Sequence, residues 1–195
     1  MKTIKNQGIT LIELIIVISI IGILAVALGF EFSGWMGGYR VESQTKEMYV
    51  DLMNARARAM QRNRTHFVRL NDSTSYSIYE DDSDGTNKVP DGDGTLQLGT
   101  GSSADTELPT FHRTVEYNLD WNNNAITSPI RLTFNTRGLA TTLGSLSIFV
   151  DRDGDDKKDV DPDYDCIVIS ATRINMGNLN DKGTTSRADD ECIAK

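Results

Sequence analysis

The sequence predicts an α+β protein in which a long N-terminal helix packs on antiparallel β-sheet. Three observations support this fold class. An apolar run lies near the N-terminus, a helical repeat of small and apolar residues follows it, and short alternating segments separated by Gly, Asn and Asp fill the remainder. These patterns divide the chain into residues 1–8, 9–30, 31–64 and 65–195.

The composition narrows the function classes. The 195 residues are 38% hydrophobic and 25% charged, which excludes a disordered or fibrous chain. The net charge of −8 has the wrong sign for holding nucleic acid by neutralising phosphates. His66 and His112 lie in no metalloprotease-like or nucleophile-elbow motif, and no nucleophile, base and orienting group can be assembled from the sequence. We therefore expect a non-enzymatic protein.

The apolar run is long enough to cross a membrane. From Leu14 to Phe30 there are 17 consecutive uncharged residues, and extending the run back to Ile9 gives 22 residues in which Glu13 is the single charge. As a helix, these residues reach about 33 Å, which exceeds a hydrocarbon core of about 30 Å. Lys2 and Lys5 precede the run, so we expect a cytoplasmic N-terminus and a translocated remainder.

Three interpretations of this run compete. A secretory signal peptide has a small-x-small cleavage site, as in Ala25-Val26-Ala27, but its apolar core is usually shorter and carries no carboxylate. A plain anchor uses Thr10 and Glu13 as a capping box, with the carboxylate returning to the Thr10 backbone N–H. In the third interpretation the carboxylate has a partner in another molecule, because an unpaired charge in the bilayer costs about 2.5–3.5 kcal/mol.

The segment Gly8-Ile9-Thr10-Leu11-Ile12-Glu13-Leu14 and the apolar run after it resemble the class III signal of type IV pilins and type II secretion pseudopilins. The resemblance implies that residues 1–8 are a leader peptide removed after Gly8 by a prepilin peptidase, and that the new amine of Ile9 is methylated. It also implies that residues 9–30 remain as a transmembrane helix. We expect the protonated amine of Ile9 in a neighbouring subunit to pair with Glu13 and to set the stagger of helices in a filament.

The apolar run continues into an amphipathic helix. Small or apolar residues recur at alternate steps of four and three, which marks one face of a helix over residues 31–64. They are Val41, Thr45, Met48, Leu52, Ala55 and Ala59. We interpret this stripe as the side that packs under a sheet, rather than as a cofactor site.

An arginine cluster lies at the end of this helix and just beyond it. It consists of Arg56, Arg58, Arg62, Arg64 and Arg69. One interpretation is a solvated helix end whose cations complement the helix dipole, and the other is a patch that grips DNA. Since the chain after Phe30 carries 18 basic and 27 acidic residues, we favour the solvated end and expect nucleic acid not to be a partner.

The period changes from helical to alternating after Asn63, which predicts a β-rich domain over residues 65–195. The connections are too short for repeated crossover helices, so we expect antiparallel strands. The expected strands are His66–Leu70, Ser75–Tyr79, Val115–Leu119, Ile130–Phe134, Ser145–Val150 and Cys166–Ser170. The segment Asp81–Pro109, rich in Asp, Gly, Ser and Thr, is expected to be a long loop.

Three further blocks, Leu52–Arg64, Leu132–Ala140 and Cys166–Ser170, resemble in order and spacing the GspH/FimT group of minor pseudopilins and minor pilins. This resemblance implies a structural subunit in the tip or initiating complex of a type II secretion pseudopilus or type IV pilus. It implies a bacterial inner-membrane protein with a periplasmic domain. Its expected partners are other pilins or pseudopilins, the prepilin peptidase, the inner-membrane assembly platform and membrane lipid. The alternative is a membrane-anchored binding module, for example for DNA uptake.

An acidic segment follows the fifth expected strand. Its carboxylates suit Ca²⁺, which prefers hard oxygen ligands. The candidate ligands are Asp151, Asp153, Asp155 and Asp159. An EF-hand loop would need Gly in place of Asp156 and Glu in place of Pro162, so we favour an acidic turn with no cofactor and keep Ca²⁺ as the alternative.

Two cysteines, Cys166 and Cys192, lie in the translocated part, where an oxidising envelope permits a disulfide. Closing the loop between them would stabilise the fold by about 3.5 kcal/mol on the chain-entropy model. Free thiols or a metal pair are the alternatives, and no His flanks either cysteine. We expect the disulfide.

Overall fold

The computed structural model describes residues 9–81, 96, 98, 106–107, 112–148, 150, 158–180 and 191–195. In this part of the chain, one helix precedes eleven short strands, and all strand pairs are antiparallel. The α+β prediction is therefore confirmed. The chain divides into two compact units, Met1–Gly37 and Gly38–Lys195.

The helix α1 runs without a break from Leu11 to Arg62. Its last residue is followed by Asn63, which has a φ of 54°. Asparagine adopts this left-handed conformation more readily than most residues, and it is a common helix terminator. The predicted segments 9–30 and 31–64 thus share one helix, and the leader 1–8 lies outside the described residues.

The first sheet has the strand order β3-β2-β1-β7, and β4 also pairs with β2. Its strands are β1 (His66–Asp72), β2 (Ser75–Glu80), β3 (Thr106–Glu107), β4 (Arg113–Thr114) and β7 (Ile130–Phe134). The first strand after the helix is central, because His66 opposes Glu80 on β2 and Phe134 on β7.

The second sheet has the order β11-β10-β9-β8-β5-β6. Its strands are β5 (Leu119–Trp121), β6 (Asn124–Ala125), β8 (Gly144–Ile148), β9 (Cys166–Ile169), β10 (Ile174–Asn180) and β11 (Glu191–Ala194). The hairpin from β5 to β6 turns through Asn122 and Asn123, which both have positive φ. Asparagine tolerates these angles in tight hairpin turns.

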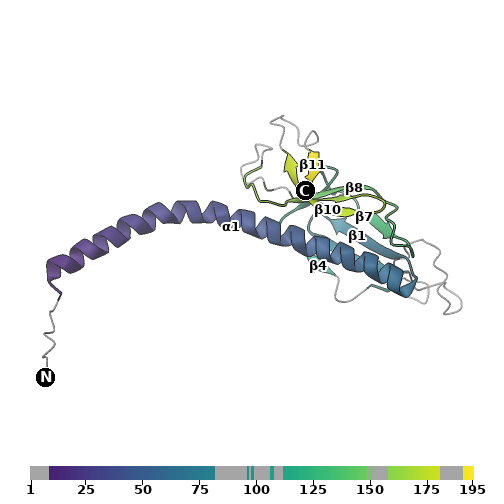
Figure 1. Cartoon of the computed structure of the whole chain (residues 1–195), viewed down its shortest axis with the longest axis horizontal. Helices are drawn as coiled ribbons and strands as arrows, with labels where there is room; N and C mark the ends of the chain where they lie inside the picture. The colour runs from purple at the N-terminus through teal and green to yellow at the C-terminus, as the bar shows by residue number, and fades with distance from the viewer. Residues whose placement is uncertain are drawn as a thin grey trace, which may run out of the picture. The chain divides into compact units, whose positions relative to one another are not determined.

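The core of the Gly38–Lys195 unit lies between α1 and the sheets, and Figure 1 shows the second half of α1 running along the strands. All six residues of the predicted stripe are at most 2% exposed. Five of them, all except Thr45, belong to one buried cluster with residues of both sheets, including Leu70, Phe134 and Ile148. The stripe prediction is confirmed, and burial of each large side chain contributes about 1.5–3 kcal/mol.

The expected strand Val115–Leu119 is wrong. The chain leaves β4 at Thr114 and enters β5 only at Leu119. Between them, the Gln44 side chain of α1 accepts hydrogen bonds from the backbone N–H groups of Glu116 and Tyr117 and donates one to the Tyr117 carbonyl. A side chain therefore satisfies the backbone here in place of a neighbouring strand.

Strands β10 and β11 were not expected from the sequence. In β10, four of the seven residues are Asn or Gly, which are depleted in strands. A Cβ at Gly177 in β10 would lie 2.3 Å from the Ile193 carbonyl oxygen, so glycine is required for the close approach of β11. The prediction of a continuous loop over Asp81–Pro109 is also wrong in part. Thr106 and Glu107 form strand β3, which pairs with β2. Most other residues of that loop lie outside the described ranges.

Candidate functional site

The start of α1 is fixed by a capping box. The Glu13 carboxylate accepts hydrogen bonds from the Thr10 backbone N–H at 3.4 Å and from the Thr10 hydroxyl at 3.3 Å. The Thr10 hydroxyl in turn accepts one from the Glu13 backbone N–H at 3.3 Å. Each side chain thus satisfies an N–H group that the first turn leaves unpaired. Ile9 is 76% exposed, and Gly8 lies outside the described residues.

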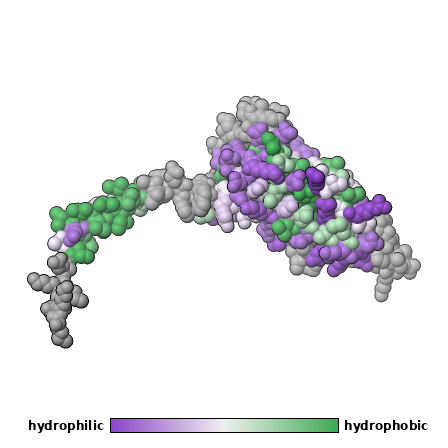
Figure 2. Space-filling view, in the orientation of Figure 1, coloured by the Kyte–Doolittle hydropathy of each residue, from purple (hydrophilic) through white to green (hydrophobic). Residues whose placement is uncertain are grey.

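The residues after this cap expose apolar side chains on every side of the helix. From Leu11 to Val26, each Ile, Leu and Val is between 48% and 76% exposed. Figure 2 shows this part of α1 as a continuous hydrophobic surface. A helix that is apolar all round needs a membrane or other protein to cover it. Among the described residues, we find no helix with the length and apolarity of a membrane span.

The polar side chains of this segment are satisfied within the helix itself. Thr10 and Glu13 bond to each other, and the Ser19 hydroxyl donates to the Ile15 carbonyl at 2.7 Å. The segment therefore presents an apolar surface on which these three polar groups already have partners. Such a surface can bind lipid or another apolar helix, because neither demands hydrogen bonds.

The arginines at the end of α1 are solvent-accessible, with side chains 53% exposed at Arg62 and 31% at Arg64, but both also pair with a buried carboxylate. Arg62 and Arg64 both bond to Glu80, at 2.6 Å and 2.8 Å, and the Glu80 side chain is only 3% exposed. A buried carboxylate at the end of β2 thus holds the end of the helix and the turn after it. Arg69 instead donates to Asn71. The position of Glu80 at the end of an alternating strand was the signal that the sequence offered for this contact.

His66 lies beside the same carboxylate. Its ring is fully buried, its Nδ1 donates to the Arg64 carbonyl at 3.2 Å, and its Nε2 is 3.8 Å from Glu80 Oε2. Burial lowers the pKa of His66 below its ordinary value, although the Arg64 carbonyl and Glu80 oppose that shift. The lowered pKa favours the neutral imidazole of this buried residue at neutral pH.

The predicted calcium ligands are only partly described. Asp151, Asp153 and Asp155 lie outside the described residues, and Asp159 is exposed, with its backbone N–H bonded to the Val150 carbonyl. Within the described ranges, no three His, Cys, Asp or Glu side chains gather in a way that could hold a metal ion. Calcium binding stays an untested alternative.

A lysine provides the positive charge next to this acidic segment. The Lys158 ammonium donates to Asp165 at 3.0 Å and to the Leu179 carbonyl at 3.1 Å, and it pairs with Asp161 at 3.1 Å. Asp165 is fully buried and also accepts from the Leu179 backbone N–H. Burial lowers the pKa of Lys158, but the two carboxylates outweigh it and raise that pKa above its ordinary value. No local pattern in the sequence predicts this pair, because its partners Asp165 and Leu179 are brought to Lys158 by the fold.

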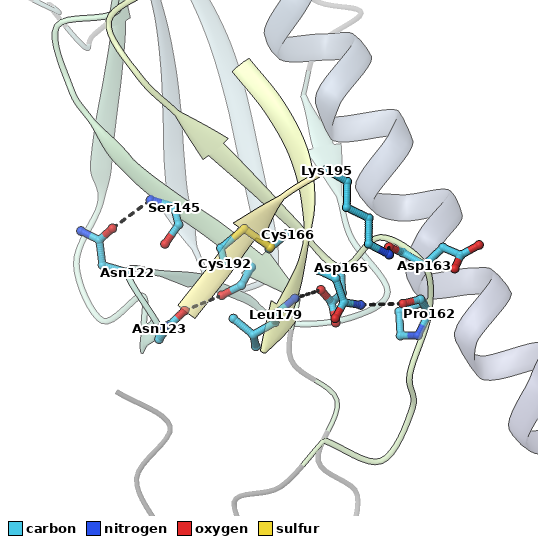
Figure 3. The surroundings of a disulfide bond; sticks show 12 residues. Asn122, Asn123, Ser145, Pro162, Asp163, Asp165, Cys166, Leu179, Cys192 and Lys195 are labelled. Atoms are coloured by element: carbon cyan, nitrogen blue, oxygen red, sulfur yellow. Dashed lines mark hydrogen bonds between the residues drawn. A yellow bond between two sulfur atoms is a disulfide. The ribbon is translucent and has the colours of Figure 1, made fainter. Parts of the chain in front are cut away.

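Cys166 and Cys192 form a disulfide between β9 and β11, two strands that both pair with β10. Figure 3 shows the bridge close to Asp165 and Leu179. Leu179 packs against both cysteines. The disulfide, the buried ion pair and the contacts of Leu179 together hold the C-terminal strand on the second sheet.

Comparison with known families gives two matches. The family model of the prokaryotic N-terminal methylation motif matches residues 4–29, and that of type II transport protein GspH matches residues 44–172. The first match covers the capping box and the apolar segment, and the second covers α1 from Gln44 to its end and most of both sheets. No curated protein and no solved structure matches significantly.

Proposed function

The chain belongs to the family of type II transport protein GspH, and on that premise we propose that it is a minor pseudopilin that enters a type II secretion pseudopilus in its initiating or tip complex. The two family matches together indicate that the chain is a pilin-like structural subunit. Members of this family are structural subunits, and the family is not known for enzymatic activity.

One observation carries the proposal. Residues 11–26 of α1 expose apolar side chains all round the helix, next to a single carboxylate, Glu13. We propose that residues 9–30 cross the inner membrane with the N-terminus in the cytoplasm and the domain in the periplasm, and that the segment later passes into the filament. Lipid, a prepilin peptidase, an inner-membrane assembly platform and other pseudopilins are then its successive partners.

Glu13 has a specific role in this proposal. In the free subunit, its carboxylate bonds to Thr10 of the same chain. After cleavage behind Gly8, the protonated amine of Ile9 in a neighbouring subunit can pair with Glu13, so both charges are compensated in an apolar environment. The pair also sets the axial stagger of the helices, because only one register brings the amine to the carboxylate.

Intact mass of the subunit from native envelopes tests the processing. The expected mass lacks Met1–Gly8 and includes one added methyl group. A chain that still begins with Met1, or one that begins at Leu28 as after a secretory cleavage, would contradict the proposal.

Two substitutions at Glu13 separate its two roles. Glu13→Gln keeps an acceptor for the Thr10 N–H but removes the charge, and Glu13→Ala removes both. If the charge pairs with a neighbouring amine, both variants insert in the membrane but fail to enter the filament. If Glu13 acts only as a helix cap, Glu13→Gln assembles like the unmodified chain, and the pairing proposal is wrong.

The anchored DNA-binding module receives less support. Two of the five arginines that it would use bond to the buried carboxylate of Glu80 instead. Retention of the full chain on DNA, decreasing with added salt, would restore that alternative.

A further inference from the structure

A pocket of about 420 Å³ lies within the Gly38–Lys195 unit. One wall is α1 between Tyr39 and Met48, and the opposite wall is the segment Arg113–Glu116, which leads away from β4. The volume is in the range of pockets that bind small molecules. The proposed function gives none of these residues a role.

Hydrogen bonds from α1 hold the second wall in place. The Gln44 side chain accepts from the backbone N–H groups of Glu116 and Tyr117 at 3.1 Å and 3.0 Å, and it donates to the Tyr117 carbonyl at 2.9 Å. The wall therefore has a defined position before any ligand arrives. A pocket that is already ordered loses little conformational entropy on binding.

The buried end of the pocket is held in a similar way. The hydroxyl of Tyr76 donates to Asp51 Oδ2 at 2.9 Å, and the same oxygen lies 3.4 Å from Arg113 Nε. Burial, and then the charge of Asp51, raise the pKa of Tyr76 above its ordinary value, so the hydroxyl stays a donor. Asp51 thus orients both the tyrosine and the guanidinium that line the pocket.

The side chains that line the pocket carry charges of both signs. Arg40 pairs with Glu116 at 2.9 Å, and Arg113 pairs with Glu47 at 3.1 Å. All four side chains are between 42% and 57% exposed, and such pairs contribute little to stability, so a ligand can open them. A simple anion or cation would meet like charges as well as opposite ones. A zwitterion satisfies both signs.

Apolar surface supplies another part of the lining. Met48 is buried, Val115 is half-buried, and the Tyr39 side chain is exposed. These groups lie in the same pocket as the charged pairs, so a ligand held by its charges can also place an apolar group against them. An aromatic or branched aliphatic group suits the tyrosine ring.

From this lining, we propose that the pocket binds a free apolar α-amino acid, a zwitterion with an ammonium group, a carboxylate and an apolar side chain. The ligand inserts between Arg113 and Glu47. Arg113 binds the carboxylate, because its contacts with Glu47 and Asp51 use only some of its five N–H donors. Glu47 binds the ammonium. The site lies within one subunit, so the inference does not depend on the proposed function.

Calorimetric titration of the full chain in detergent micelles tests the binding. The probe is L-phenylalanine, and two analogues serve as matched controls. N-acetyl-L-phenylalanine lacks the ammonium group, and L-phenylalaninamide lacks the carboxylate. We expect saturable heat with the amino acid at about millimolar concentration or below, and binding at least about tenfold weaker for each analogue. No saturable heat, or equal binding of either analogue, would overturn the proposal.

A pair of substitutions on α1 locates the site. Glu47→Gln keeps the shape of the side chain but removes the charge that binds the ammonium, so the dissociation constant should rise about tenfold. Glu42→Gln is the control, because Glu42 pairs with Lys46 and does not line the pocket. It should leave the affinity unchanged. Formation of the Cys166–Cys192 disulfide verifies that both variants are folded. Unchanged affinity in Glu47→Gln would contradict the site.

A lipid head group with an ammonium and a phosphate has related chemistry. The titration is therefore repeated in nanodiscs of phosphatidylcholine alone and in nanodiscs that also contain phosphatidylethanolamine. Equal affinity for L-phenylalanine in both supports a soluble ligand. Loss of binding with phosphatidylethanolamine would assign the pocket to lipid and overturn the proposal. None of these results bears on processing or filament entry, which intact mass and incorporation test separately.

Discussion

The two halves of α1 both carry apolar side chains but use them in opposite ways. Residues 11–26 expose their apolar side chains on all sides, whereas the stripe from Val41 to Ala59 is at most 2% exposed. Burial of one face within the chain stabilises the domain, because the same molecule supplies the covering sheets. Exposure on all faces leaves the stabilisation to lipid or to other subunits. One continuous helix therefore supports the folded domain at one end and leaves an apolar surface open at the other.

The largest expected effect comes from the ion pair that holds the second sheet. Asp165→Ala should lower the free energy of unfolding by about 3–5 kcal/mol, because it leaves the Lys158 ammonium buried without its main partner. Urea unfolding of the full chain in detergent, followed by tryptophan fluorescence, measures it. The control is Asp161→Ala, since the Asp161 side chain is 86% exposed and its pair is worth about 0–1 kcal/mol. Similar losses in the two variants would contradict the assignment.

A matched pair of truncations tests the comparison between the halves. Leu52→Ala should cost about 2–5 kcal/mol of domain stability, because Leu52 is 2% exposed and its removal leaves a cavity. Ile20→Ala should change domain stability by about 0.5 kcal/mol or less, since Ile20 is 53% exposed. The same unfolding experiment applies. A comparable loss from Ile20→Ala would mean that the apolar segment supports the domain.

The helix cap should matter only locally. Thr10→Ala removes the hydroxyl that accepts from the Glu13 N–H, which should cost about 1 kcal/mol in the first turn. Hydrogen exchange of the first-turn amides should accelerate about fivefold, while the unfolding free energy of the domain stays unchanged. Ser19→Ala, which removes a hydroxyl farther along the helix, is the control. Unchanged exchange in Thr10→Ala would show that the capping box contributes nothing to this end.

The smallest effect expected is a pH dependence from His66. Burial lowers its pKa in the folded chain, so the folded state binds fewer protons than the unfolded state. The stabilisation is present at pH values above the ordinary histidine pKa of about 6.5. It is lost as the pH falls from there toward the lowered pKa of His66 in the folded chain. Unfolding free energy measured across this range should fall less steeply with acid in His66→Gln. If the free energy of unfolding fell equally steeply with acid in His66→Gln and in the unmodified chain, the pH dependence would come from other groups.

Local patterns in the sequence predict several features of the fold. The start of α1 is encoded in Thr10 and Glu13, the buried face in the four-and-three spacing, and β7 in Ile130–Phe134, which the structure reproduces without a shift. The strands at His66, Ser75, Ser145 and Cys166 differ from their predicted bounds by only one or two residues. Each of these features follows from the periodicity of neighbouring residues.

Other features depend on residues far apart in the chain and could not be predicted from local patterns. Gln44 replaces a strand at Glu116 and Tyr117, and Glu80 pairs with Arg62 and Arg64 from the end of α1 and the turn after it. Gly177 admits a C-terminal strand whose partner lies more than ten residues away. In each case a hydrogen bond, charge or close approach is completed by a residue that no local pattern identifies. Such pairs become visible only after the fold has brought them together.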